Sequence, residues 1–233
     1  MGRVGGQRLR AACVVALALI ATACANKVPR IAPSAQIWDR NVAVGVAMMP
    51  LPAAAAYKEG SQGLLDIAIN SAMASDLDSH LSRLDVTGID QAGDQIIGKL
   101  ESRGVRAQRI SEAIDPERFP KSGGDGKHTA ERNYDVLATR YGVQRLVLIQ
   151  LASVGTTRHY FGFVPTSSPK GYARATAQMI DLRTGELLWS AASVRRQDVA
   201  DEWDQPPAFP NVDRAIADTL RAVAHDLASD LAF

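Results

Sequence analysis

The sequence predicts an α/β fold, a single domain with a mixed β-sheet flanked by helices, which follows a cleaved signal peptide. Three observations support this prediction. Apolar residues make up 46% and charged residues 22% of the 233-residue chain, proportions typical of globular proteins. Strand-like and helix-like segments alternate through the first two thirds of the chain, and a strand–turn–strand unit follows them. We find no internal repeat, which favours one globular unit.

The first 23 residues have the features of a secretory signal. Arg3, Arg8 and Arg10 precede an apolar run over 11–23, which is too short to span a bilayer because a spanning helix needs about 20 apolar residues. Removing this segment takes three of the 26 basic residues and none of the 25 acidic ones, so the net charge changes from +1 to −2. A chain with this balance lacks the basic surface that a general nucleic-acid-binding protein needs.

Residues 20–24, Ile-Ala-Thr-Ala-Cys, resemble the lipobox of bacterial lipoproteins. In that family the cysteine thiol is joined to diacylglycerol, the signal is cut before the cysteine, and the new amino group is acylated. The resemblance implies that Cys24 is lipidated, and Ala25 in place of Asp implies retention in the outer membrane. Ala21 departs from the usual Leu, so an ordinary signal followed by a chance cysteine is the alternative. Cys13 leaves with the signal, so the mature chain would carry no free thiol.

The mature chain divides into a lipidated tether over 24–37 and a periplasmic α/β domain over 38–233. Pro29 and Pro33 and the absence of any periodicity predict the tether. The domain begins with the apolar run 42–48, which is typical of a strand covered on both faces.

Apolar residues spaced every three or four positions predict four helices. The first is expected over 61–84, with Ser61 as its N-cap. Two more are expected over 91–103 and 129–141, separated by a loop over 115–128, and each is followed by a glycine that suits a helix C′ position. The last is expected to begin at a capping Asn211 and to bury the stripe Val212, Ile216, Leu220, Val223, Leu227 and Leu231.

Shorter periods predict the remaining strands. We expect an edge strand over 105–110, a central strand over 145–152, and a strand over 171–182 that turns back into a strand at 187–191. The strand over 171–182 places alanines on one face, which lets a helix approach closely.

This order of elements, together with the hairpin Ile-Asp-Leu-Arg-Thr-Gly-Glu-Leu-Leu-Trp at 180–189, resembles a group of envelope lipoproteins. The group includes the curli-secretion lipoprotein, the lipoprotein activators of penicillin-binding proteins, and relatives of the amino-terminal domain of TolB. Segments 160–166 and 203–210 are also similar to those of uncharacterised proteobacterial lipoproteins. The resemblance implies a mixed sheet flanked by helices and an envelope location, and it supplies no catalytic residue.

No motif in the sequence supports catalysis or metal binding. Residues 167–170 match Ser-x-x-Lys without its partner motifs, and the glycine-rich segment 123–127 lacks the spacing of a phosphate-binding loop. Asp76 and His80 lie four residues apart on an expected helix, which is a weak metal signal without further ligands. We therefore expect no enzymatic activity, no cofactor and no metal site.

Aromatic residues mark the candidate contact surface. Tyr160, Phe161 and Phe163 leave a strand and enter a loop rich in Pro, Ser and Gly. They either cover the sheet or form a partner surface. Trp203 and Phe209 lie in a proline-rich connection that they are expected to pin to the domain. If these two segments meet, they build one patch.

The sequence thus predicts a non-catalytic interaction or assembly factor, lipid-anchored in the outer membrane and facing the periplasm. Its partner would be another envelope protein or a second copy. The alternative is a small-molecule or glycan-binding domain that uses the 160–165 aromatics as a stacking platform and requires a concave pocket beside them. A hydrolase with His159 paired to Asp181 or Asp204 is the least favoured reading.

Overall fold

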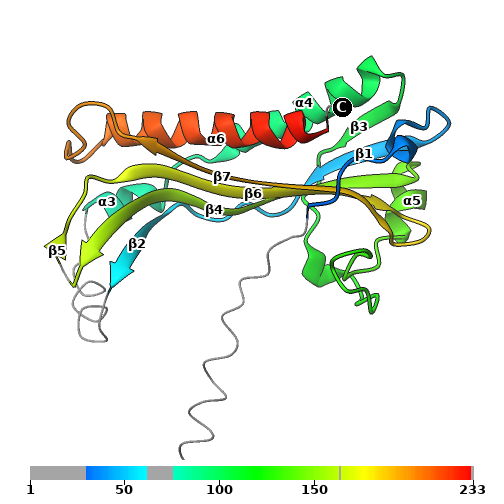
Figure 1. Ribbon diagram of the computed structural model, residues 1–233, viewed down its shortest axis with the longest axis horizontal. Helices are drawn as coiled ribbons and strands as arrows, with labels where there is room; N and C mark the ends of the chain where they lie inside the picture. The colour runs from blue at the N-terminus through cyan, green and yellow to red at the C-terminus, as the bar shows by residue number, and fades with distance from the viewer. Residues whose placement is uncertain (1–29, 62–75, 163, 232–233) are drawn as a thin grey trace, which may run out of the picture.

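The core of the molecule is a mixed sheet in the order β3-β1-β4-β6-β7, with β2 and β5 also paired to β4 (Figure 1). This computed structural model describes residues 30–61, 76–162 and 164–231. The strands are β1 (Ala43–Met48), β2 (Ala55–Ser61), β3 (Arg106–Ile110), β4 (Arg145–Phe161), β5 (Val164–Pro165), β6 (Lys170–Asp181) and β7 (Leu187–Asp198). The helices are α3 (Asp76–Leu81), α4 (Gln91–Ser102), α5 (Val136–Tyr141) and α6 (Pro210–Asp230), with 3-10 turns at Ala35–Trp38, Thr87–Asp90 and Pro116–Arg118.

Strand direction divides the sheet into two parts. β1 runs parallel to both β3 and β4, and β2 runs parallel to the second half of β4. β6 and β7 complete an antiparallel meander with β4. The predicted fold class, a single α/β domain with a mixed sheet flanked by helices, is confirmed.

Helix α6 lies along one face of the sheet, over β6 and β7 (Figure 1). Its predicted apolar stripe is buried, and small residues on β6 allow the close approach. A Cβ added at Gly171 would lie 2.6 Å from the backbone of Ala215, so only glycine fits at this contact. The prediction that small side chains on this strand admit a helix is therefore confirmed.

The opposite face is covered at the other end of the sheet, near the start of β4. There α5 and the segment before it bury a second apolar cluster that includes Tyr134, Leu137 and Leu148. The predicted helix stops are confirmed: Gly104 and Gly142 have φ of 82° and 65°.

One helix start was predicted wrongly, and another falls outside the described residues. Ser61 is the last residue of β2, a strand that the sequence did not predict. Most of the helix expected over 61–84 falls on 62–75, which lie outside the described residues, and its described part is α3. The helix expected from residue 129 begins at Val136, because the backbone of Thr129 pairs with Glu186 instead.

Asn211 is not the cap of the last helix. Helix α6 begins at Pro210, whose missing N–H costs nothing in the first turn. The Asn211 side chain instead donates to the carbonyl of Glu202 at 2.8 Å and to Gln205 at 3.3 Å, which ties the preceding connection to the helix.

The predicted tether, 24–37, extends too far at its domain end. Ile31 pairs through its backbone with Ser190, and Ile37 is fully buried in a 3-10 turn. The carbonyl of Gln36 also accepts a 2.7 Å hydrogen bond from the Arg145 guanidinium. Packed chain therefore begins near Ile31, whereas the signal and Cys24 lie outside the described residues. Within the described ranges, no helix has the length and apolar character needed to cross a bilayer.

One ion pair clips α6 to β7. Asp226 accepts hydrogen bonds from the Arg195 Nε at 2.6 Å and Nη2 at 2.7 Å, and from the Ser193 hydroxyl at 2.6 Å. These hydrogen bonds, Arg195's first, lower the pKa of Asp226 below its ordinary 3.8. The carboxylate therefore stabilises the fold above the ordinary pKa, and this contribution is lost as the pH falls through the lowered value.

We expect Asp226→Asn to lower the free energy of unfolding at pH 7 by about 1 kcal/mol, because a charged two-point hydrogen bond becomes a neutral one. Urea denaturation of both proteins should show the difference at neutral pH and little difference once the pH lies below the lowered pKa of Asp226. An equal loss at both pH values would contradict an electrostatic role.

Candidate functional site

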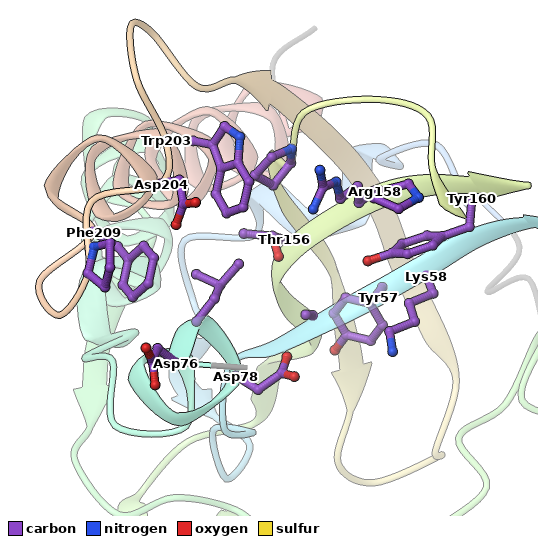
Figure 2. A pocket seen from close by; sticks show the side chains of 15 residues that line it. Tyr57, Lys58, Asp76, Asp78, Thr156, Arg158, Tyr160, Trp203, Asp204 and Phe209 are labelled. Carbon is purple, nitrogen blue, oxygen red and sulfur yellow. The ribbon is translucent and has the colours of Figure 1, made fainter. Parts of the chain in front are cut away.

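A cavity of about 400 Å³ opens at the end of the sheet where β2, β4 and β5 meet the connection between β7 and α6 (Figure 2). We call it the distal cavity. It is lined by residues of β2, α3 and β4, by two prolines of the loop around β5, and by the connection. Its lining residues are Ala56, Tyr57, Lys58, Asp76, Leu77, Asp78, Thr156, Arg158, Tyr160, Pro165, Pro169, Trp203, Asp204, Pro206 and Phe209.

Strand β4 supplies one wall because alternate residues of a strand face the same side. Thr156, Arg158 and Tyr160 all line the cavity. The Arg158 guanidinium lies 4.8 Å from the centre of the Trp203 ring, and its Nε donates to the carbonyl of Ser167 at 2.6 Å. Arg158 thus joins the strand, the β5 loop and the connection around one space.

Phe209 anchors the far end of the connection. Its side chain is 2% exposed although its backbone is left-handed, with φ of 43°, a costly conformation for a bulky residue. The ring packs 5.3 Å from that of His80, and His80 Nε2 lies 2.6 Å from Asp213 on the first turn of α6. The prediction that Phe209 pins the proline-rich connection is confirmed.

The structure brings two of the predicted contact residues together. Tyr160 and Trp203, 43 positions apart in the sequence, line the same cavity, as expected if the two aromatic segments meet (Figure 2). Phe161 is 78% exposed, so it does not cover the sheet. Phe163 and Cys24 lie outside the described residues.

Sequence reasoning missed Thr156, Arg158 and Lys58 as site residues. The central strand was expected to end at residue 152, whereas β4 continues to Phe161 over 17 residues. The polar alternation of residues 156, 158 and 160 was the available signal for this extension.

The residue pairs considered for a hydrolase are not assembled as proposed. His159 Nε2 lies 3.4 Å from Glu59 on the neighbouring strand. Asp181 lies opposite Arg145 at the other end of β4, where its carboxylate accepts the backbone N–H groups of a turn. Asp204 lines the distal cavity, into which His159 does not project.

The glycine-rich segment 123–127 lies in a loop whose backbone N–H groups are bound by the side chain of Asp125, a residue of the same loop. The Asp125 carboxylate accepts the backbone N–H groups of Lys127, His128 and Thr129, which lower its pKa well below the usual range. Those N–H groups are thereby occupied rather than presented to a phosphate. Among the described side chains, no group of three His, Cys, Asp or Glu residues is arranged to hold a metal ion.

No protein-family model matches the sequence, and no curated protein matches it. Three solved structures illustrate its structural likenesses. They are the hypothetical protein CT253 from Chlamydia trachomatis (12% identity over 81% of this chain and 97% of that one, TM-score 0.41), the PelC dodecamer from Paraburkholderia phytofirmans (11%, 88% and 95%, TM-score 0.35) and lipoprotein GNA1162 from Neisseria meningitidis (13%, 78% and 99%, TM-score 0.31). At these identities and TM-scores the likeness assigns neither a family nor a function.

Proposed function

We propose that this chain is a lipid-anchored protein of the bacterial envelope that binds a partner and catalyses no reaction. The observation that carries the proposal is the convergence of Tyr160, Trp203 and the exposed Phe161 at one end of the sheet. The sequence predicts the same residues as a contact surface. Tyr and Trp are enriched among the few residues that dominate the binding energy of protein interfaces.

The anchor supports an envelope location. The lipobox-like residues 20–24 provide the attachment cysteine, and the residues between Cys24 and Ile31 provide a short tether. Acyl chains at Cys24 would hold the domain at the periplasmic face of the outer membrane, as Ala25 favours. A protein held there meets other envelope proteins at high effective concentration.

The exposed apolar end of the sheet supports a protein partner. Phe161 is 78% and Val164 49% exposed, and the two residues are cross-strand neighbours on β4 and β5. Apolar surface of this kind is covered favourably by a partner, at about 25 cal/mol per Å² removed from water. We expect the partner to be another envelope protein, with a second copy of this chain as the alternative.

A photo-crosslinking residue at Phe161 tests this proposal in living cells. We expect it to capture a defined envelope protein, identified by mass spectrometry, that a crosslinker at Thr139 does not capture. Thr139 is also exposed but lies on α5, at the far end of the sheet. Identical products from both positions, or none from Phe161, would overturn the proposal.

A second candidate function, binding of a small molecule or glycan, is favoured by one specific observation. That hypothesis required a concave pocket beside the aromatic loop, and the distal cavity lies there. The two functions use adjacent surfaces, because Phe161 points away from the cavity that Tyr160 lines.

A further inference from the structure

The floor of the distal cavity carries the hydroxyl group of a threonine. Thr156 is 1% exposed, and its hydroxyl points into the cavity (Figure 2). Within the described part of the chain this hydroxyl makes no hydrogen bond. Thr219, equally buried on α6, instead donates to the carbonyl of Ala215 at 2.7 Å. The Thr156 hydroxyl is therefore available to a polar group inside the cavity.

Two further polar groups face the same space. Figure 2 shows the Tyr160 hydroxyl directed toward the cavity and Asp204 on its rim beside Trp203. Neither the Tyr160 hydroxyl nor the Asp204 carboxylate has a hydrogen bond or ion pair among the described residues. The cation Arg158 is already engaged with Ser167 and with the Trp203 ring. Lys58 and Asp78 also line the cavity and have partners of their own. The acceptors that face a ligand therefore include the carboxylates of Asp76 and Asp204 and the two hydroxyls, which together favour a ligand that donates hydrogen bonds.

Apart from these groups and the charged side chains of Lys58, Asp76 and Asp78, the cavity lining is apolar and aromatic. Trp203, Phe209 and Leu77 form its walls together with three prolines. A ligand that fits must combine a flat apolar face with hydrogen-bond donors around its edge. Pyranose sugars have this form, because axial C–H groups make one face apolar while hydroxyls surround the ring.

We infer that the distal cavity binds a neutral glycan, with a sugar ring against Trp203 and its hydroxyls bonded to Asp204 and Thr156. This inference rests on the second candidate function above and names its ligand class. The volume of about 400 Å³ suits one or two sugar rings. Asp204 would repel an acidic sugar, so the site discriminates against uronic acids.

The test uses the full lipidated protein in a detergent without a sugar headgroup, labelled with ¹⁵N at the tryptophan indoles. The chain has three tryptophans, and Trp203→Phe identifies the signal from the cavity. Titration with cellobiose or N,N′-diacetylchitobiose is expected to shift the Trp203 signal to saturation and to leave those of Trp38 and Trp189 in place. Glucuronic acid is expected to produce no shift.

Thr156→Val removes the floor hydroxyl and keeps the shape of the side chain. We expect it to weaken disaccharide binding about tenfold. The matched control Thr139→Val, on the exposed surface of α5, should bind as the parent does. If the Thr156→Val protein bound the disaccharides as tightly as the parent, with unperturbed indole signals before titration, the proposed contact between the Thr156 hydroxyl and the sugar would be refuted.

Two outcomes would overturn the inference that the ligand is a glycan. One is an unmoved Trp203 signal with both disaccharides at ~50 mM, a concentration that detects even very weak binding. The other is a response to spermidine alone, which would make the ligand a cationic amine. Crosslinking from Phe161 is independent of both results, so failure of the glycan is distinguishable from failure of the partner surface.

Discussion

Replacing Gly155 by valine is expected to lower the free energy of unfolding by about 4 kcal/mol, the combined cost of backbone strain and overpacking. Gly155 has φ of 136°, which side-chain-bearing residues rarely adopt. A Cβ at this position would overlap the carbonyl oxygen of Ala55 and lie 2.6 Å from its nitrogen. Both obstacles are backbone atoms, so no rotamer change can relieve the clash. Urea denaturation followed by circular dichroism would measure the loss.

The same substitution should also damage the distal cavity. The pairing of β2 with β4 begins at Ala55 and Gly155, and the next residue of each strand, Ala56 and Thr156, lines the cavity. We therefore expect the folded fraction of the variant to lose the response of Trp203 to disaccharides.

Gly98→Ala provides the control for this prediction. Gly98 lies inside α4 with no atom within 4 Å of a Cβ built on it. Alanine is therefore expected to stabilise the helix by about 0.5–1 kcal/mol. Unchanged urea midpoints for Gly155→Val would mean that the β2–β4 contact is looser than described.

The elements that sequence analysis predicted well are those that pack against one core along their whole length. Helix α6 repeats apolar residues every three or four positions because a single face lies on the sheet. Strand β6 alternates for the corresponding reason. Strand β1 is apolar throughout because both of its faces are covered. Local patterning determines such elements, and the sequence displays that patterning directly.

Elements at the distal end of the sheet were missed because their neighbours, rather than their own patterns, stabilise them. Strand β2 contains Tyr57-Lys58-Glu59, where Tyr57 contacts Tyr172 on β6 and Glu59 pairs with Arg196 on β7. These contacts span more than a hundred residues of sequence. No local sequence pattern predicts these long-range contacts, so a strand was not expected at residues 55–61.

The candidate site was foreseeable only in part. Composition and loop context predicted Tyr160 and Trp203 as contact residues, because both are large aromatics in or next to proline-containing loops. The Thr156 hydroxyl was not foreseeable, since its orientation depends on the register of β4 and on the path of the connection over it. A threonine in a strand gives no sign of a binding role in the sequence, because that role depends on the cavity that the tertiary structure forms above it.

Cys24→Ser is expected to abolish acylation and to release the protein from the membrane fraction. The nucleophile that accepts diacylglycerol is the thiolate, and a serine hydroxyl does not replace it at neutral pH. Each buried methylene of an acyl chain contributes about 0.8 kcal/mol to membrane binding.

Metabolic labelling with an alkynyl palmitate and density-gradient separation of the two membranes would measure both effects. The parent should be labelled and sediment with the outer membrane, and Cys24→Ser should be unlabelled, as an uncleaved precursor or a soluble chain. Cys13→Ser, which changes the signal alone, serves as the matched control and should keep the label. Unchanged labelling of Cys24→Ser would reject Cys24 as the lipid site. Labelled parent protein in the inner membrane would support lipidation at Cys24 but refute the outer-membrane location inferred from Ala25.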